Sequence, residues 1–288
     1  EKKMYIVNDS ATLNDRYRSN IIQNLKRSNV EVISLGAFDG CWSFVMVLFA
    51  FIFKPKDVIT SNLKVNLIFL IFFWSSGLII VNGLGRLSTN ISFRRIIGLF
   101  LNINRRKKFF IQNYRDFRYF RRFFRSNIFW SPGSGGRRRE FGVQNFHVIV
   151  SRSSKLSLQM DSLREAVEQV PRKNGIALVG VDTFTEDLSD LGVSLCGHVA
   201  QENIFSFGNS YIQLSGYGEG IPHALIDALV TDIEVHLTKK DFVQYGLNNL
   251  GFKFKLTGGK WGICKPFDYK IASKICYKEI ANLILSDV

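Results

Sequence analysis

The chain has 288 residues, with 38 Lys and Arg against 24 Asp and Glu, a formal net charge of +14, and 46% hydrophobic residues. This composition excludes a disordered tail, a collagen-like chain and a small disulfide-stabilised protein. The length allows one large or two ordinary domains, and we expect two. Four cysteines without CxxC spacing predict neither a zinc site nor a redox pair. With a charged N-terminus that lacks a signal-peptide pattern, they favour a cytoplasmic location.

The first half of the chain alternates short β-branched segments with segments of helical length. Such alternation is typical of a parallel sheet covered by helices. A helix is predicted at 15–26, and strands are predicted at 4–7, 30–35, 58–60, 78–82, 107–113 and 127–130.

Two apolar segments, 42–53 and 65–81, raise the question of a membrane hairpin. Both are shorter than the about 20 apolar residues of a spanning helix, and three lysines and an aspartate lie between them. We interpret them as a buried helix and a second apolar segment that ends in a core strand; the membrane hairpin is the alternative.

The positive charge is concentrated between Arg94 and Arg139, where fourteen Lys and Arg stand against one acid, Asp116. Helical spacing over 114–125 puts arginines on one face and phenylalanines on the other. The arginines are Arg118, Arg121, Arg122 and Arg125; the phenylalanines are Phe117, Phe120 and Phe124. This pattern fits an anionic membrane surface, and equally a solvated helix whose phenylalanines face the core. No nucleic-acid partner is expected, because no recognition motif accompanies the charge.

A Pro/Gly/Ser segment at 131–136 is the best domain boundary, and the same alternation restarts after it. Strands are predicted at 147–150, 176–179, 193–196, 211–214 and 233–237, and helices at 162–170, 223–230, 240–250 and 269–285. The architecture is therefore two doubly wound α/β domains, 1–130 and 131–268. The last segment, 269–288, is a helix that could pack on either domain.

The glycine clusters at 133–136 and 257–261 lack the features of a phosphate-binding Walker loop and are interpreted as turns. The four histidines show no metal-binding spacing, and His147 and His236 lie within apolar strands. No metal and no cofactor are expected.

The most informative segment is 215–229, in which Glu219 and Asp227 flank the start of a predicted helix. Gly220, Ile221 and Pro222 lie where that helix begins, so that backbone N–H groups there can face an anion such as a diphosphate. Two carboxylates at this spacing can reach one elongated ligand with several hydroxyl groups. An ordinary capped helix is the alternative interpretation.

This segment resembles the carboxylate motif of retaining family-4 glycosyltransferases of the bacterial surface-polysaccharide class, in which seven residues separate two glutamates; Asp227 takes the second position. Further segments resemble the family in order along the chain: 81–86, 110–113, 132–135, Ser151-Arg152 and 195–199. The resemblance implies a GT-B fold, two Rossmann-like domains facing across a cleft, with the nucleotide-sugar held mainly by the second.

The resemblance also implies roles for individual residues. Glu219 would contact the donor sugar and Arg152 the diphosphate, as the catalytic pair. The donor would further contact Asp227 through its ribose, the amides of Gly220 and Ile221, and Gly197, His198 and Lys155. The acceptor side would comprise Asn82, Gly83, Asp15 and Arg16.

The implied function is metal-free transfer of a hexose from a nucleotide-sugar, with UDP-sugar as the expected donor, to a lipid-linked or polysaccharide acceptor on the inner face of the membrane. The sequence departs from the family at Ser157, where a lysine is usual, and at Lys239-Lys240, where a Gly-Gly turn is usual. A catalytically degenerate relative that binds a glycan or a lipid is therefore the alternative.

Overall fold

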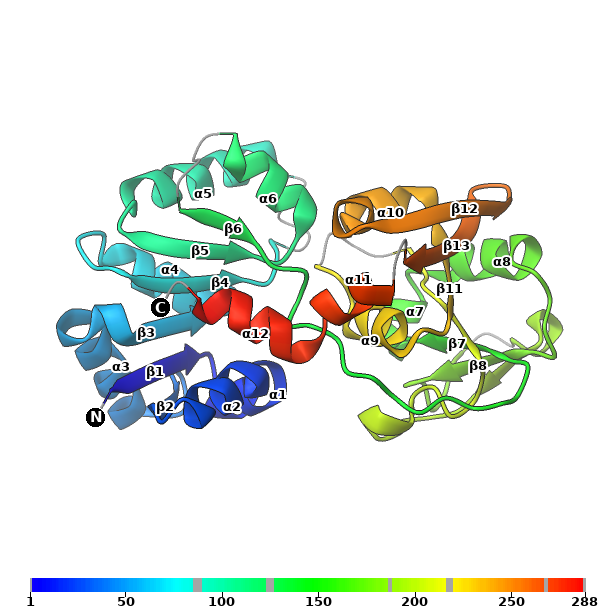
Figure 1. Ribbon diagram of the computed structural model, residues 1–288, viewed down its shortest axis with the longest axis horizontal. Helices are drawn as coiled ribbons and strands as arrows, with labels where there is room; N and C mark the ends of the chain where they lie inside the picture. The colour runs from blue at the N-terminus through cyan, green and yellow to red at the C-terminus, as the bar shows by residue number, and fades with distance from the viewer. Residues whose placement is uncertain are drawn as a thin grey trace. The chain divides into compact units, whose positions relative to one another are not determined.

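The computed structural model describes residues 2–84, 90–122, 127–185, 188–215, 220–266 and 269–286 (Figure 1). The chain forms two compact units. The first unit comprises Glu1–Gly135, Tyr217–Ile221 and Tyr277–Val288, and the second comprises Gly136–Gly216 and Pro222–Cys276.

The first unit is built on a six-stranded parallel sheet with the order β2-β1-β3-β4-β5-β6. The strands are β1 Lys3–Asn8, β2 Glu31–Gly36, β3 Val58–Ser61, β4 Gly77–Val81, β5 Lys107–Ile111 and β6 Ile128–Trp130. All but the edge strand β2 contain β-branched or aromatic residues that are buried on the sheet, as the alternation in the sequence predicts.

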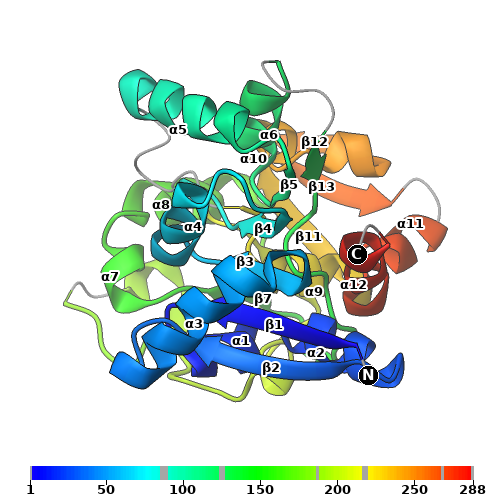
Figure 2. The same cartoon turned by 90° about the vertical axis from the view of Figure 1, so that its left-hand side faces the viewer.

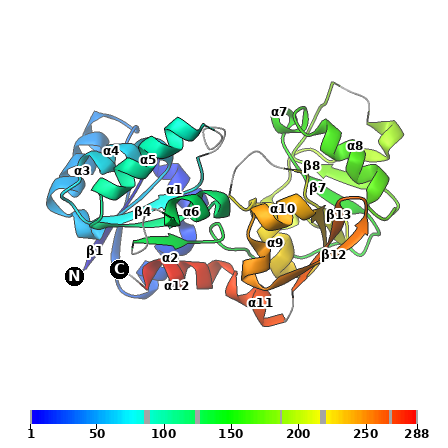
Figure 3. The same cartoon turned by 90° about the horizontal axis from the view of Figure 1, so that it is seen from above.

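Helices cover both faces of this sheet (Figure 3). On one face α3 Cys41–Phe53, α4 Leu63–Ile71, α5 Ile91–Ile103 and α6 Tyr114–Arg121 share one apolar core with the strands. On the other face α2 Ser19–Arg27 and α12 Tyr277–Leu285 pack against the sheet, with the short α1 Ala11–Tyr17 preceding α2.

The helix predicted at 15–26 is two helices, because the chain breaks at Arg18. The segments at 42–53 and 65–81 form α3, α4 and the core strand β4, as interpreted from the sequence. Within the residues that the structure describes, no helix is long and apolar enough to cross a membrane.

The second unit contains a seven-stranded sheet with the order β12-β13-β11-β10-β7-β8-β9. Five strands are parallel: β7 His147–Val150, β8 Ile176–Val179, β9 Val193–Leu195, β10 Ser210–Ile212 and β11 Glu234–Thr238. The helices are α7 Ser153–Leu156, α8 Met160–Gln169, α9 His223–Thr231, α10 Lys239–Gln244 and α11 Tyr269–Lys274.

An antiparallel hairpin completes this sheet and was not predicted. Strands β12 Phe252–Gly258 and β13 Trp261–Pro266 pair with each other, and β13 pairs with β11. The lysines and exposed side chains of β12 weaken the apolar pattern by which the other strands were predicted. The helix predicted at 240–250 ends at Gln244, and the one predicted at 269–285 is divided into α11 and α12.

Candidate functional site

The topology of the second unit marks one edge of its sheet as a binding site. From β7 the chain continues to β8 and β9 on one side, whereas β10 and β11 lie on the other side of β7. In open α/β sheets, ligands bind beyond the carboxyl ends of the strands at the point where the strand order reverses. Here that point lies between the carboxyl ends of β7 and β10. Ser151-Arg152 follows β7 in the chain, and Leu214-Ser215 comes shortly after β10.

Gln159 connects the two segments at this point. Its amide nitrogen donates to the backbone oxygen of Ser215 at 2.6 Å, and its amide oxygen lies 3.3 Å from the hydroxyl of Ser151. The backbone N–H of Ser215 donates to the hydroxyl of Ser162 at 3.0 Å. Gln159 is buried, so these bonds fix the two strand ends relative to each other.

Asp241 extends this network to β11. Its carboxylate accepts hydrogen bonds of 2.8 Å from the hydroxyls of Ser215 and Thr238. Burial raises the pKa of Asp241, while the two hydroxyls act in the opposite direction. Neither Gln159 nor Asp241 was predicted as a site residue; the one local sign was the capping spacing from Thr238 to Asp241.

The loops after β8 and β9 meet beside the same edge. The backbone N–H of Gly180 donates to the oxygen of Gly197 at 2.7 Å. Gly180 has a φ of +89°, and a Cβ there would lie 2.4 Å from the oxygen of Ser151, so only glycine fits. His198 lies in an exposed pair with Asp182, with 2.7 Å between Nδ1 and Oδ2, and this hydrogen bond lowers the pKa of Asp182.

Arg152 and Lys155, the two cations predicted for a diphosphate, follow β7 directly. Arg152 is exposed at the start of α7, and Lys155 is half-buried on that helix. The structure thus brings Arg152, Lys155, Gly197 and His198 to the loops at the carboxyl ends of three adjacent strands, β7, β8 and β9, where a phosphate-containing ligand could be held.

Asp227 occupies a different environment from the one predicted for a ribose ligand. It lies on the second turn of α9, where its carboxylate is 2.9 Å from both Nε and Nη2 of Arg139 and accepts from the backbone N–H of Arg137 at 2.8 Å. Both side chains of the pair are less than one-tenth exposed, at 3% and 8%. The carboxylate of Asp227 thus holds residues 137–139, which follow the domain linker, against α9.

Glu219 lies outside the described residues. Gly220 and Ile221 belong to the first unit, where a Cβ on Gly220 would lie 3.1 Å from the oxygen of Asn82 and 3.2 Å from that of Gln112. These two residues therefore lie at the carboxyl ends of β4 and β5.

The first unit has a polar network at its own carboxyl edge. Asn8, at the end of β1, donates to the hydroxyl of Ser61 at 2.9 Å and accepts from the amide of Asn62 at 2.7 Å. Asn82 donates to Asn62 at 3.0 Å and accepts from Arg18. The strand order reverses between β1 and β3, so this network also lies at a switch point.

Arg18 connects this network to the domain linker. Its guanidinium donates to the hydroxyl of Ser134 at 2.9 Å and to the oxygen of Tyr17 at 3.0 Å, and burial lowers its pKa to about 10. The predicted acceptor-side residues Asp15 and Arg16 are instead exposed on α1 and make no described contact with Asn82. In the sequence, only helical spacing pointed to a buried Arg18, because it lies three and four residues before Ile21 and Ile22 on the apolar face of α2.

The arginine helix α6 separates its residues as predicted. Phe117 and Phe120 are buried in the core, whereas Arg118, Arg121 and Arg122 are exposed. Arg125 and Phe124 lie outside the described residues.

Gly83, predicted on the acceptor side, follows Asn82 in the turn after β4. Its φ is +143°, and the N–H of the next residue, Leu84, donates to the buried carboxylate of Asp116 on α6 at 3.2 Å.

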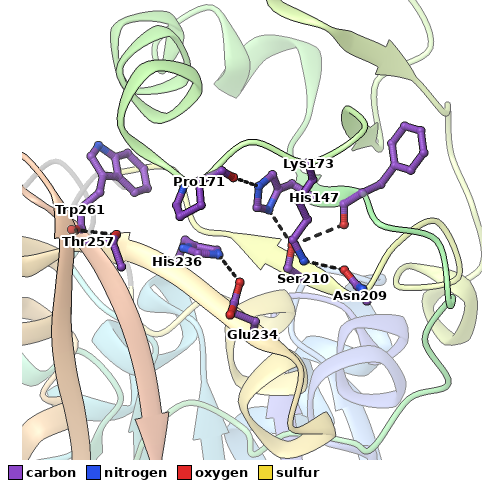
Figure 4. Close-up of polar contacts among 10 residues, drawn as sticks. His147, Pro171, Lys173, Asn209, Ser210, Glu234, His236, Thr257 and Trp261 are labelled. Carbon is purple, nitrogen blue, oxygen red and sulfur yellow. Dashed lines mark hydrogen bonds and ion pairs between the residues drawn. The ribbon is translucent and has the colours of Figure 1, made fainter.

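Two buried histidines lie in the second sheet, His147 at the amino end of β7 and His236 in the middle of β11 (Figure 4). His147 bonds the hydroxyl of Ser210 at 2.6 Å and the oxygen of Pro171 at 2.8 Å, and His236 bonds Glu234 at 2.8 Å. Burial lowers the pKa of both, that of His147 to about 4. Among the described residues no group of His, Cys, Asp and Glu could hold a metal ion.

Comparison with solved structures identifies the fold. HepE of Anabaena, Alr3699, in complex with UDP matches with a TM-score of 0.57 and 14% identity over 99% of this chain and 89% of HepE. The same protein with UDP and glucose gives 0.57 and 13% over the same shares. TarM gives a TM-score of 0.45 and 12% identity over 66% of this chain, which spans 43% of TarM.

No protein-family model matches the sequence, and no curated protein matches it. The two Rossmann-like units and the match to HepE over nearly the whole chain show the GT-B fold, which confirms the predicted fold class.

Proposed function

We propose that this chain is a glycosyltransferase that transfers a hexose from a nucleotide-sugar to a lipid-linked or polysaccharide acceptor in surface-glycan synthesis. The observation that carries the proposal is the carboxyl edge of the second sheet, where Arg152 follows β7 at the switch point and Gly197 and His198 follow β9, two strands away. HepE, which has the same fold, was solved with UDP and with UDP and glucose, and this supports a UDP-sugar as the donor.

The chemistry required of these residues is electrostatic. When the sugar leaves, the nucleoside diphosphate gains negative charge, and a guanidinium with preorganised N–H groups stabilises that charge without a metal. Arg152 and Lys155 supply the positive charge beside β7, and the amides of the turn at Gly197 and His198 supply donors. By the family resemblance, Glu219 contacts the sugar and the anomeric configuration is retained.

The acceptor is proposed to bind at the first unit, at the carboxyl edge that carries Asn82 and Gly83. The network from Asn8 through Asn62 holds Asn82 in one orientation, which gives a hydroxyl-rich acceptor a fixed polar edge. The protein would act at the inner face of the cytoplasmic membrane, where lipid-linked acceptors are exposed.

The test is protection against thermal unfolding by UDP-, GDP-, ADP- and TDP-nucleotides and their sugars. A ligand at 100 times its dissociation constant adds about 2.7 kcal/mol of stability. We expect one nucleotide class to raise the melting temperature, and Arg152→Ala to remove most of that increase. Arg172→Ala is the matched control, because Arg172 is exposed at the amino edge of the same sheet.

A degenerate relative that binds donor without turnover is the second candidate. It is favoured by Ser157, which replaces the family's lysine, and by the pairing of Asp227 with Arg139. Release of nucleoside diphosphate from a nucleotide-sugar distinguishes the two: the transferase releases it when an acceptor is present, and the degenerate protein shows the thermal shift alone.

A further inference from the structure

Helices α3 to α6 lie on one face of the first sheet (Figures 2 and 3). This face exposes an unusual number of large apolar side chains. We call this set the apolar surface. On α3 and before it, it comprises Phe38, Trp42, Val45, Phe49, Ile52 and Phe53; between α4 and β4 it comprises Ile71, Phe73 and Trp74; on α5 it comprises Ile91, Ile96, Leu99, Phe100 and Ile103.

Helix α3 shows why this surface is not an ordinary solvated face. A surface helix of a globular protein is apolar toward the core and polar outward. In α3 the inward residues Val47, Ala50 and Phe51 are apolar, but so are the outward ones, and Trp42 is 76% exposed. Contiguous apolar patches of this kind mark interaction sites for proteins or membranes.

The elements that carry the apolar surface are neighbours. The buried ring of Phe51 on α3 lies 5.8 Å from the ring of Phe72, and the ring of Phe72 lies 5.6 Å from that of Trp74. Arg106, just after α5, donates to the backbone oxygen of Trp74 at 3.1 Å. The turn at 72–74 therefore lies beside α3 and beside the end of α5.

The turn that presents Phe73 and Trp74 is held in place by the buried Lys107. Its ammonium donates to the oxygen of Phe72 at 2.6 Å, to that of Ser75 at 3.3 Å and to Oδ1 of Asn104 at 2.8 Å. The two exposed aromatic rings thus project from a fixed backbone and are not part of a loose loop.

Most charges around the apolar surface are positive, and the acids next to it are Asp39 and Asp57. Helices α3, α4 and α5 contain no acidic residue, and exposed cations border them: Lys54, Lys56, Lys64, Arg95, Arg105 and Arg106. Aromatic and aliphatic side chains bordered by Lys and Arg match the interface of an anionic bilayer, where apolar groups enter the acyl boundary and cations meet the headgroups. A protein partner with a neutral apolar face would gain nothing from this border of charge.

We propose that the apolar surface docks the first unit on the surface of an anionic lipid bilayer, without spanning it. The arginine face of α6, which the sequence predicts as the membrane contact, adds charge alone, since its phenylalanines are buried. This docking does not depend on donor binding and would stand if the proposed transfer reaction failed. It would also place Phe38, whose N–H donates to the oxygen of Asp9 at 3.0 Å, and with it the polar edge at Asn8, beside the lipid.

The experiment measures co-sedimentation of the full chain with vesicles of phosphatidylcholine alone and of phosphatidylcholine mixed with phosphatidylglycerol. We expect binding to the anionic vesicles, and a loss of at least about tenfold in affinity for Trp42→Ser/Phe53→Ser, which is about 1.4 kcal/mol, because the two side chains no longer transfer apolar area into the lipid. Val143→Ser/Leu256→Ser is the matched control, because both residues are exposed in the second unit.

Tryptophan fluorescence locates the contact. The four tryptophans are Trp42, Trp74, Trp130 and Trp261, and Trp261 is fully buried in the second unit. Brominated lipids should quench the wild-type emission, and Trp42→Phe/Trp74→Phe should remove this quenching while vesicle binding is retained.

Three results would overturn the proposal. The first is no binding to either kind of vesicle. The second is equal loss in the test and control variants. The third is a concentration-dependent dimer in sedimentation velocity that Trp42→Ser/Phe53→Ser dissociates, with no vesicle binding, since a second copy of the chain would then cover the surface.

Discussion

Asp227 is the residue whose environment differs most from its predicted role. A buried carboxylate that pairs with Arg139 leaves an uncompensated guanidinium when it is neutralised. Asp227→Asn should therefore lower the free energy of unfolding by about 3–5 kcal/mol in urea denaturation. Asp190→Asn, at an exposed position, should change it by less than about 0.5 kcal/mol. A variant of unchanged stability but weaker donor binding would instead identify Asp227 as a ligand of the ribose alone.

Gly180 tests the packing of the loops at the candidate site. Gly180→Ala places a methyl group against the oxygen of Ser151 in addition to the cost of a left-handed backbone, whereas Gly192→Ala meets only the backbone cost, at φ +66° with open space around it. We expect the melting curve to show a loss of about 1 kcal/mol for Gly192→Ala and at least about 2 kcal/mol for Gly180→Ala. Equal losses would show that the close approach to Ser151 is not a constraint.

At the scale of elements, the break between α1 and α2 falls at Arg18, which is buried and has no carboxylate partner among the residues that the structure describes. Replacing it with methionine leaves the oxygens of Asn82 and Ser134 without their donor. Arg18→Met should cost about 2–4 kcal/mol of unfolding free energy. Arg16→Met, on the exposed side of α1, should cost less than about 0.5 kcal/mol. Similar values for both variants would contradict a structural role for the network.

The buried His147, at the amino end of β7, predicts that the free energy of unfolding depends on pH. The pKa of His147 is lowered to about 4 in the folded chain, against about 6.5 when unfolded, so the unfolded chain binds the proton more tightly. Stability is therefore full above about pH 6.5 and falls by up to roughly 3 kcal/mol as the pH approaches 4. Urea denaturation at several pH values should show a smaller dependence for His147→Gln than for the wild type, and an unchanged dependence would contradict this role of His147.

The sequence identified most strands of both sheets, because β-branched residues buried on two faces form short continuous apolar segments. It also placed Arg152 and Gly197 directly after strands, which is sufficient to bring them to one edge. It could not identify Gln159, Asp241 or the partner of Asp227, since these contacts join residues far apart in the chain. It missed the β12–β13 hairpin for another reason: alternating lysines there obscure the apolar pattern.

At the scale of the molecule, the two units each have a polar edge at a strand-order reversal, and the first unit alone has the apolar surface. Part of the positive charge between Arg94 and Arg139 lies on the exposed face of α6 and part at the border of that surface, whereas Lys107 is buried and Arg139 pairs with Asp227. We therefore propose donor recognition for the second unit, and acceptor and lipid recognition for the first.

Hydrogen–deuterium exchange with a saturating nucleoside diphosphate, UDP first, tests the central claim most directly. We expect slower exchange at the amides after β7, β8, β9 and β10, at 151–157, 180–184, 196–199 and 213–215. The amino-edge segment 171–175 should be unchanged, since it lies at the opposite end of the strands. No protection with any nucleotide, or protection confined to the first unit, would contradict a donor site at the carboxyl edge of the second sheet.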